Sequence, residues 1–406
     1  MQKLKAVIIG ASHAAAQLSV SLRQEGWKGE IVMIGDEPHL PYHRPPLSKT
    51  FLSGDKSIQD LLIRPAEFYA KQQIDFLHGP VVAIDRERKM LTLADGSQMS
   101  YAKLAICTGA RVRKLEIDGG ELKGVHYVRN AADITAIQEQ IKSAKHAVMI
   151  GGGYIGLETA ASLRKLGIQV SLLETSSRIL QRVTAPELSE FYTRLHQTHG
   201  VKIYNHITVE RILGTIQVEG VLCADGTMIP ADFVIVGIGV QPNIELAQIA
   251  GIDVENGIVI DSYGQTNDLN IVAAGDCTSH FNSHYQRQLR LESVPNANEQ
   301  AKIAAATLCG KFKAYNAIPW FWSNQYDIKL QIVGLNHGYD QLVIRGDIQG
   351  GNSFAAFYFK EKKLIAADCI NCPLEFMISK KIITDNIQIN PLYFADDSID
   401  LKQLTV

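Results

Sequence analysis

The chain has 406 residues, of which 46% are hydrophobic and 20% are charged, and it contains 32 glycines. This length is too great for one ordinary core, so it predicts two or three domains, and the composition excludes a disordered protein. The 40 Lys and Arg residues against 42 Asp and Glu residues give a formal charge of -2, which argues against a surface built to bind nucleic-acid phosphates.

The N-terminal stretch MQKLKAVIIGASH is basic and then briefly apolar, like the start of a signal peptide. Its apolar run is too short for a signal or membrane-spanning helix, and it ends in a glycine turn rather than a cleavage site. We therefore predict the first strand of a cytoplasmic enzyme. Scattered cysteines in mostly apolar surroundings predict buried thiols in a reducing compartment; they are Cys107, Cys223, Cys277, Cys309, Cys369 and Cys372.

Cys369 and Cys372 form a CxxC pair. A lone CxxC, without a second cysteine pair or a histidine pair, is a weak zinc signal. We also expect that it does not open a helix after a strand, as a thioredoxin-type dithiol does. The pair is therefore interpreted as two packed thiols, and no metal site is expected.

Two stretches, 5–37 and 146–176, repeat one pattern of apolar strand, glycine turn, amphipathic helix, second apolar strand and acidic residue. The helical spacing places Ala15, Leu18 and Leu22 on one face of the first helix. Ala160, Leu163 and Leu166 have the same spacing in the second helix. Each stretch is therefore predicted to be a βαβ segment.

The second segment carries the complete GxGxxG pattern at Gly151, Gly153 and Gly156. The first glycine makes the tight turn, the second lets the backbone approach a pyrophosphate, and the third lets helix and strand pack closely. Glu174 follows 18 residues after Gly156, where a carboxylate accepts ribose hydroxyls and repels a 2′-phosphate. The segment predicts an NAD site that prefers NADH, although Arg178 and Arg182 soften that preference.

The first segment keeps Gly10 but has Ser12 and Ala15 at the second and third glycine positions. Alanine is an accepted variant at the third position. Serine is tolerable at the second if its backbone keeps a negative φ, and its hydroxyl can donate to a phosphate. Asp36 stands 21 residues after Ala15, as a ribose-binding acid should.

Two distant segments support a working first site. The stretch CTGAR, 107–111, ends an apolar strand, and Asp276 follows the short strand of NIVAAGDC. A carboxylate after a glycine at a strand end is well placed to accept hydroxyls of a flavin ribitol. From about residue 317 the pattern changes to consecutive antiparallel strands, followed by the helical stretch PLEFMISKKII.

The sequence resembles the two-dinucleotide-binding flavoproteins of the glutathione-reductase fold and, among them, the NADH-dependent ferredoxin reductases of bacterial oxygenases and cytochromes P450. The stretches that carry the resemblance run nearly end to end, and the most discriminating are PYHRPPLSK and PWFWSNQYD. Asn298 and Asn324 depart from the residues of some relatives, which leaves the local hydrogen bonding there open.

The resemblance implies FAD in the first site, NADH in the second and an α/β fold. Its two Rossmann-like domains are an FAD domain, 1–110 and 240–316, with an inserted NAD domain, 111–239; a C-terminal α+β domain, 317–406, completes the flavin environment. It also implies that Arg44 and Lys49 approach the flavin and that Glu158 pairs with Lys49 near the nicotinamide. Trp322, with Trp320 as the alternative, is expected near the flavin ring.

The remaining candidate cofactor residues lie in the matched turns and strand ends. For FAD they are His13, Ala14, Glu37, Thr108, Gly109, Arg111, Gly275, Ser293 and Val294; for NAD they are Tyr154, Ile155 and Arg182. Gly237 and Gly239 are further cofactor-binding candidates, not assigned to one of the two nucleotides. His13 is assigned no chemistry of its own.

No cysteine precedes Cys107, so the chain lacks the redox cysteines that disulfide reductases and related peroxidases carry after the first βαβ segment. Electrons are therefore expected to leave singly to a two-iron two-sulfur ferredoxin, with rubredoxin as the alternative. A binding flavoprotein of the apoptosis-inducing-factor type is a third hypothesis, which the near-neutral charge disfavours. Lys380 and Lys381 are the predicted docking cations.

Overall fold

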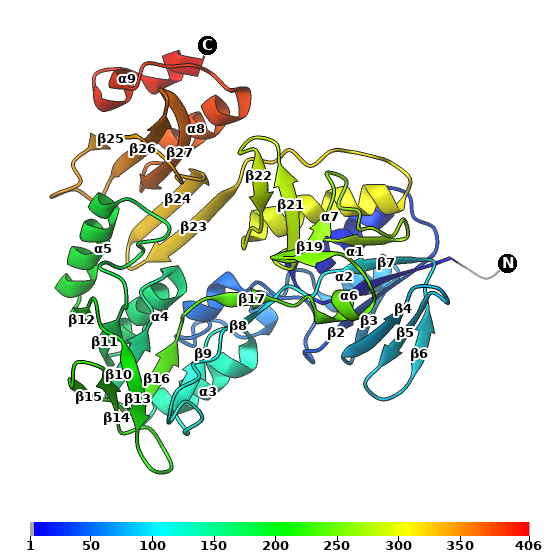
Figure 1. The fold of residues 1–406 in the computed structure, drawn as a ribbon, viewed down its shortest axis with the longest axis horizontal. Helices are drawn as coiled ribbons and strands as arrows, with labels where there is room; N and C mark the ends of the chain where they lie inside the picture. Colours follow the sequence, from blue (N-terminus) through cyan, green and yellow to red (C-terminus); the bar gives the residue numbers. More distant parts are fainter. Residues whose placement is uncertain (1–3, 406) are drawn as a thin grey trace. The chain divides into compact units, whose positions relative to one another are not determined.

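The computed structural model describes residues 4–405, and these residues form two compact units. Unit 1 comprises the chain up to His43, Ile58–Arg111 and Val240–Pro319. Unit 2 comprises Arg44–Ser57, Val112–Gly239 and the chain from Trp320 onward. Figure 1 labels most of the helices and strands of both units. No helix within the described residues is long and apolar enough to cross a membrane.

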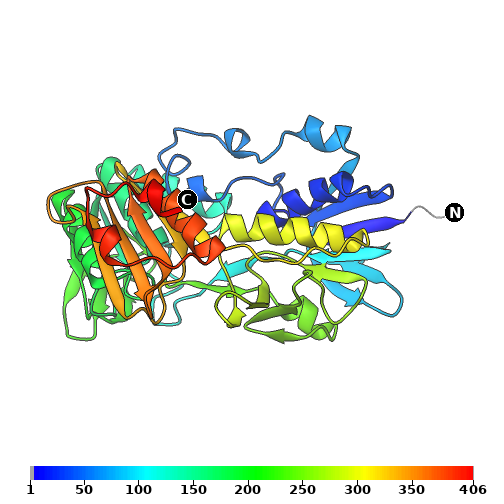
Figure 2. The ribbon, with the colours of Figure 1, turned by 90° about the horizontal axis from the view of Figure 1, so that it is seen from above.

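Unit 1 is built on a five-stranded parallel sheet in the order β20-β7-β1-β2-β3. Its strands are β1 (Lys5–Ile9), β2 (Glu30–Gly35), β3 (Ile74–His78), β7 (Lys103–Ile106) and β20 (Ile271–Ala273). Helix α1 (His13–Gln24) lies alongside α7 (Val294–Leu308), as Figure 2 shows. Leu18 and Leu22 are fully buried in the core that these helices share with the sheet, as the helical spacing predicts.

Smaller elements complete unit 1. An antiparallel sheet contains β4 (Val81–Asp85), β5 (Met90–Leu93) and β6 (Gln98–Ser100). A mixed sheet contains β18 (Val254–Glu255), β19 (Gly257–Ile260), β21 (Thr278–Asn282) and β22 (Arg287–Leu289). The short helices are η2 (Gln59–Leu61), α2 (Ala66–Lys71) and α6 (Glu245–Ile249), and β8 (Ala110–Val112) pairs with β17 (Val240–Pro242).

Unit 2 contains a second five-stranded parallel sheet, in the order β12-β11-β10-β16-β9. Its strands are β9 (Val125–Tyr127), β10 (His146–Ile150), β11 (Gln169–Leu173), β12 (Val201–Tyr204) and β16 (Phe233–Val236). The other elements here are η1 (Pro45–Ser48), α3 (Ala131–Ile141), α4 (Tyr154–Lys165), α5 (Pro186–Thr198) and the antiparallel strands β13 (Val209–Leu213), β14 (Gly220–Cys223) and β15 (Met228–Pro230).

The C-terminal part of unit 2 is an antiparallel sheet in the order β23-β24-β27-β26-β25, which confirms the predicted consecutive strands. Its elements are β23 (Trp320–Gln325), β24 (Ile328–Gly334), β25 (Gln341–Gly346), β26 (Phe354–Lys360), β27 (Lys363–Ile370), α8 (Pro373–Asp385), α9 (Leu392–Ala395) and η3 (Leu401–Thr405). The predicted fold class, two Rossmann-like sheets and a C-terminal α+β part, is confirmed. The three predicted domain ranges stay a prediction.

Two local predictions are wrong. Leu166, expected on the buried face of α4, is 37% exposed because the helix ends at Lys165 and Leu166 is its C-cap. The CxxC pair does open a helix after a strand, because Cys369 lies in β27, one residue before its end, and Cys372 is the N-cap of α8. The signal that was overlooked is Pro373, which occupies the first helical position. All six cysteines are free thiols, although Cys309 and Cys372 are only half-buried.

Candidate functional site

The glycine turn of unit 1 is closed by neighbouring strands. Gly10 has φ +117°, and a Cβ on it would lie 2.1 Å from the carbonyl oxygen of Cys107. Only glycine fits this position, because the backbone is left-handed and the adjacent chain leaves no room. The first position of the GxGxxG pattern therefore has its expected geometry in unit 1.

Ser12, at the second glycine position, is the N-cap of α1 with φ -128°. Its counterpart in unit 2, Gly153, is the N-cap of α4 with φ -81°. Neither position uses the left-handed region, so the second glycine matters for space and not for backbone conformation. The negative φ that makes serine tolerable is present.

The other predicted residues of unit 1 gather at the carboxyl edge of the sheet. Strands β20, β7 and β1 are adjacent and parallel, so the segments after them meet at one edge. Gly275 has φ +94°, and a Cβ on it would lie 3.2 Å from Ala14 and 3.8 Å from Ala297. Asp276 is therefore brought to the N-terminal end of α1, and Ser293 and Val294 begin α7 close to Ala297.

The remaining flavin candidates differ in their surroundings. The Thr108 hydroxyl donates to the Asn243 carbonyl oxygen over 2.7 Å, and Gly109 has φ +63°. Arg111 is bound to Glu245 over 2.6 Å and to Asn243. Its guanidinium is thus engaged by side chains that the sequence did not single out.

The acidic residues after β2 lie at the expected strand end. Asp36 follows β2 directly and is exposed, and Glu37 accepts a 2.5 Å hydrogen bond from the Tyr42 hydroxyl. His13, the first residue of α1, is buried, with its ring 5.5 Å from that of His43.

The glycine turn of unit 2 has the same construction. Gly151 has φ +105°, and a Cβ there would lie 2.5 Å from the carbonyl oxygen of Gly237. A Cβ on Gly156 would lie 2.3 Å from the carbonyl oxygen of Gly151, so close helix packing requires this glycine. A Cβ on Gly153 would meet nothing within 4 Å. The turn therefore leaves space beside the N-terminus of α4, where a pyrophosphate binds in such folds.

The acidic residue and the two arginines predicted after β11 differ in their contacts. Glu174 accepts hydrogen bonds from the backbone N–H groups of Gly152, 2.8 Å, and Ser176, 2.7 Å. Arg178 donates to the Ser189 hydroxyl on α5 and to the Gln181 carbonyl oxygen in its own loop, so its guanidinium is held by both segments. Arg182 is exposed.

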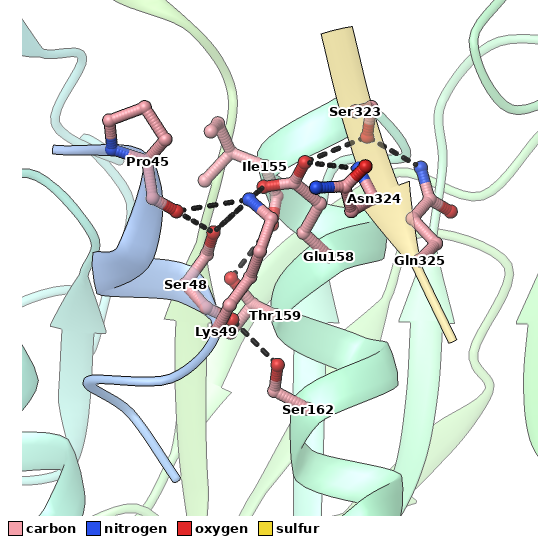
Figure 3. Close-up of polar contacts among 10 residues, drawn as sticks. All are labelled: Pro45, Ser48, Lys49, Ile155, Glu158, Thr159, Ser162, Ser323, Asn324 and Gln325. Carbon is pink, nitrogen blue, oxygen red and sulfur yellow. Dashed lines mark hydrogen bonds and ion pairs between the residues drawn. The ribbon is translucent and has the colours of Figure 1, made fainter. Parts of the chain in front are cut away.

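Lys49 and Glu158 form an ion pair in unit 2, as Figure 3 shows. Lys49 follows η1, and Glu158 lies on α4, five residues after the second glycine. The Lys49 side chain is 20% exposed and that of Glu158 only 4%. The pair that the resemblance implies is present, and its role stays a prediction.

Glu158 is held from both sides by residues that sequence reasoning missed. Its Oε2 atom also accepts the Ser48 hydroxyl over 2.7 Å, and its Oε1 atom accepts the Ser323 hydroxyl over 2.7 Å. Figure 3 places these donors on η1 and β23, on either side of α4. The backbone N–H of Asn324 adds a contact of 3.3 Å. Because that contact uses the backbone, the unusual identity of Asn324 does not affect it.

A buried chain of side chains continues from Ser323. The amide nitrogen of Gln325 donates to the Ser323 hydroxyl over 3.1 Å, and its Oε1 atom accepts a hydrogen bond of 2.8 Å from His196 Nε2. Burial lowers the pKa of His196 to about 4. The imidazole is therefore neutral at pH 7 and able to donate from one nitrogen and accept at the other.

The remaining candidates of unit 2 lie on or beside its helices and strands. Arg44 donates to the Arg129 carbonyl oxygen over 2.9 Å. Trp320 and Trp322 lie on one face of β23, with ring centroids 5.6 Å apart, and both are half-buried. Tyr154 and Ile155 open α4, and Gly239 ends the segment after β16 with φ +100°.

The two turns fit dinucleotides by their own geometry. Each joins a buried parallel strand to a helix N-terminus, has a first glycine that no other residue can replace, and is followed by an acid after the next strand. Such a helix N-terminus attracts phosphate charge. Unit 1 would hold FAD through Gly10, Ser12, Asp36 and Asp276, and unit 2 would hold NAD through Gly151, Gly153 and Glu174. No cluster of metal-binding side chains occurs within the described residues.

Residues 4–301 match the model of the pyridine nucleotide-disulphide oxidoreductase family, and residues 320–405 match the reductase C-terminal family. The chain is 44% identical to putidaredoxin reductase of Pseudomonas putida, over 98% of this chain and 96% of the relative. It is 35% identical to a rubredoxin-NAD(+) reductase of the same species, over 90% and 96%.

Two solved structures are similar over nearly the whole chain. The ferredoxin reductase for the CYP199A2 system from Rhodopseudomonas palustris is 40% identical, with a TM-score of 0.96 over 99% of this chain and 100% of that one. The reductase of the covalent putidaredoxin reductase-putidaredoxin complex is 43% identical, with a TM-score of 0.95 over 98% and 97%. The chain therefore belongs to the pyridine nucleotide-disulphide oxidoreductase family and, within it, to the ferredoxin reductases that carry a reductase C-terminal domain.

Proposed function

We propose that the protein is a cytoplasmic NADH:ferredoxin oxidoreductase, which takes two electrons from NADH and passes them singly to a two-iron two-sulfur ferredoxin. That ferredoxin would supply an oxygenase or a cytochrome P450. The observation that carries the proposal is the pair of glycine turns on two separate parallel sheets, in a chain that has no cysteine before Cys107.

FAD, when bound, supplies chemistry that accepts a hydride and releases electrons one at a time. Per turnover, one NADH and two oxidised ferredoxins give one NAD+, two reduced ferredoxins and one proton. Without a cysteine in the first βαβ segment, the chain has no thiol there to take the electrons as a pair. One-electron delivery to an external iron–sulfur protein is the outcome that this absence favours.

The proposed roles of this chain's residues follow from their contacts. Lys49 supplies a cation that stabilises negative charge developing on the reduced cofactor. Glu158, held by two hydroxyls and one backbone N–H, orients Lys49. Glu174 favours NADH, because a carboxylate at this position accepts ribose hydroxyls and repels a 2′-phosphate.

The proposed docking surface for the ferredoxin lies on α8, at Lys380 and Lys381. Lys380 Nζ lies 5.4 Å from the ring centroid of Trp320, and Met377 on the same helix is 60% exposed. A cationic surface with apolar side chains suits a small acidic partner. The cytoplasmic location is supported by the six free thiols.

The function is tested with purified protein. We expect bound FAD, seen by its visible absorbance, and bleaching of that absorbance on addition of NADH without oxygen. Cytochrome c reduction should then require added ferredoxin. Absence of flavin, or flavin that NADH does not bleach, would contradict the proposal.

Rubredoxin remains the alternative acceptor, because a rubredoxin reductase is also a relative, at 35% identity. The same cytochrome c assay, supplemented with rubredoxin in place of ferredoxin, separates the two carriers. Faster reduction with rubredoxin would favour the alternative.

A further inference from the structure

Asp368 is a buried carboxyl group in the C-terminal sheet. It lies on β27, is 1% exposed, and forms no ion pair within residues 4–405. Its Oδ2 atom accepts two hydrogen bonds of 2.6 Å, from the hydroxyls of Thr184 and Tyr358. Burial raises the pKa of Asp368 to about 6, against the opposing effect of these two hydroxyls. Burying a carboxyl without a cation costs stability, so its contacts need an explanation.

Thr184 ends the segment that follows the acid of the NAD site. We call residues 174–184 the nucleotide loop. At its start, Glu174 accepts the Gly152 N–H over 2.8 Å; near its middle, the Leu180 N–H donates to the Gly152 carbonyl oxygen over 2.9 Å. The loop is therefore hydrogen-bonded to both the N–H group and the carbonyl oxygen of Gly152, which lies within the glycine turn.

The far end of the loop is bonded to the C-terminal sheet. In addition to the Thr184 contact, the Tyr358 hydroxyl accepts the Ala185 N–H over 3.2 Å, and Asn336 donates to the Val183 carbonyl oxygen over 3.3 Å. Ala185 is the N-cap of α5 and has no side-chain acceptor of its own. The Tyr358 hydroxyl binds the N–H of the N-cap residue itself, as a Glu or Gln at the third helical position does in a capping box; Leu188 occupies that position here.

Helix α5 packs on the same sheet. Phe191 on α5 and Phe354 on β26 lie edge to face, with ring centroids 4.9 Å apart. Arg194 on α5 donates to the Ile348 carbonyl oxygen over 2.8 Å. The C-terminal sheet therefore supports both the end of the nucleotide loop and the helix that follows.

We propose that Asp368 and Tyr358 are positioning residues for the nicotinamide dinucleotide: by binding Thr184 and Ala185, they fix the nucleotide loop against Gly152. A loop fixed before binding needs less ordering when the dinucleotide arrives, which raises affinity without changing the chemical step. This inference rests on the proposed function, in which unit 2 binds NADH.

The test uses three variants of the full-length holoenzyme. Tyr358→Phe removes the hydroxyl bound to Asp368 and Ala185. Asp368→Leu removes the acceptor in a side chain of similar size. Asp368→Asn is the rescue variant, because both hydroxyls donate to one carboxylate oxygen and an amide oxygen in that place accepts both. Tyr339→Phe is the control, since the Tyr339 ring packs on that of Tyr358 with centroids 5.1 Å apart.

The first measurement is hydrogen exchange of backbone amides without nucleotide. We expect faster exchange in peptides covering 175–185 for Tyr358→Phe and Asp368→Leu, and unchanged exchange for Asp368→Asn and Tyr339→Phe. The second is titration calorimetry of NAD+ binding to the oxidised enzyme. Its Kd should rise about tenfold in the first two variants, because binding must then order a loop that the wild type holds in place beforehand. The KM for NADH should rise in parallel while kcat is retained.

The outcomes separate the inference from the proposed function. Wild-type protein that does not bind NAD+ contradicts the function, whatever the exchange data show. Wild-type binding together with unchanged exchange or unchanged Kd in Tyr358→Phe overturns the positioning role. Should Asp368→Leu fail to fold, Tyr358→Phe still decides the question, because it removes one oxygen atom and keeps the ring.

Discussion

The Ser323 hydroxyl donates a hydrogen bond of 2.7 Å to Glu158. This contact joins β23, the first strand of the C-terminal sheet, to α4, the helix after the second glycine turn. The other oxygen of the same carboxylate forms the ion pair with Lys49 and accepts a hydrogen bond from the Ser48 hydroxyl. One carboxylate therefore joins three segments that are far apart in the sequence. Because all its donors point at a buried negative charge, Glu158 is fixed in one orientation.

The Lys49–Glu158 pair should contribute to stability as a coupled unit. Removing one partner leaves the other charge buried without compensation, which typically costs about 3–5 kcal/mol. We expect Lys49→Met and Glu158→Gln each to lower the free energy of unfolding, and the double variant to lose less than the sum of the two. Urea unfolding of the four proteins measures the coupling.

The control for this cycle is the exposed pair Lys142 and Glu139, three residues apart on the protein surface. Lys142→Met should change stability by less than about 1 kcal/mol. Strictly additive losses at Lys49 and Glu158 would contradict the coupling.

The buried imidazole of His196 should make the free energy of unfolding decrease in mild acid. Burial lowers its pKa from 6.5 to about 4. Between these values the unfolded chain binds a proton that the folded protein does not, so stability falls as pH decreases through this window. The loss approaches about 3 kcal/mol, at about 1.4 kcal/mol for each pH unit. At pH 7 the contribution is fully present.

The measurement is urea unfolding from pH 7 to pH 4 for wild type and His196→Gln. A glutamine keeps a donor toward Gln325 but does not titrate, so the difference between the two proteins should shrink or reverse as the pH falls. His337→Gln, at an exposed position, should follow the wild type. Parallel curves for wild type and His196→Gln would show that His196 is not the titrating group.

The features that sequence predicts here are local. A glycine turn, the strand before it and the helix after it lie within about a dozen residues, and their periodicity is visible in the sequence. The contacts that complete the sites are not local: Ser323 and Glu158 are 165 positions apart, and Asp368 and Thr184 are 184 apart. Serine, threonine and tyrosine hydroxyls have no spacing signature, so only the folded chain identifies these partners. Glu158 and Lys49 were predicted through the family resemblance and not through their spacing.

Substitutions at the first and second positions of the glycine turn in unit 1 should have opposite effects on flavin content. Ser12→Gly should preserve the flavin content, because Ser12 already has the negative φ of its counterpart Gly153. Gly10→Ala should lose flavin and destabilise the protein, because its Cβ would lie 2.1 Å from the Cys107 carbonyl oxygen. The ratio of visible to 280 nm absorbance in the purified proteins measures flavin content.

The matched substitution in the second turn is Gly153→Ser, which copies Ser12. A Cβ at Gly153 meets nothing within 4 Å, so the protein should fold normally and NAD+ binding reports whether a serine is tolerated beside the pyrophosphate. A marked loss of flavin in Ser12→Gly would instead mean that the Ser12 hydroxyl itself takes part in binding.

The docking prediction for α8 is tested by charge reversal. Lys380→Glu with Lys381→Glu should raise the KM for an acidic ferredoxin by about tenfold at low salt, and less at high salt, because screening weakens the interaction of exposed charges. Ferricyanide reduction, which needs no protein partner, should be unchanged. Lys362→Glu with Lys363→Glu is the matched control, since these adjacent cations lie at the turn between β26 and β27. Equal effects of the two double variants, or a parallel loss of ferricyanide reduction, would place the docking surface elsewhere.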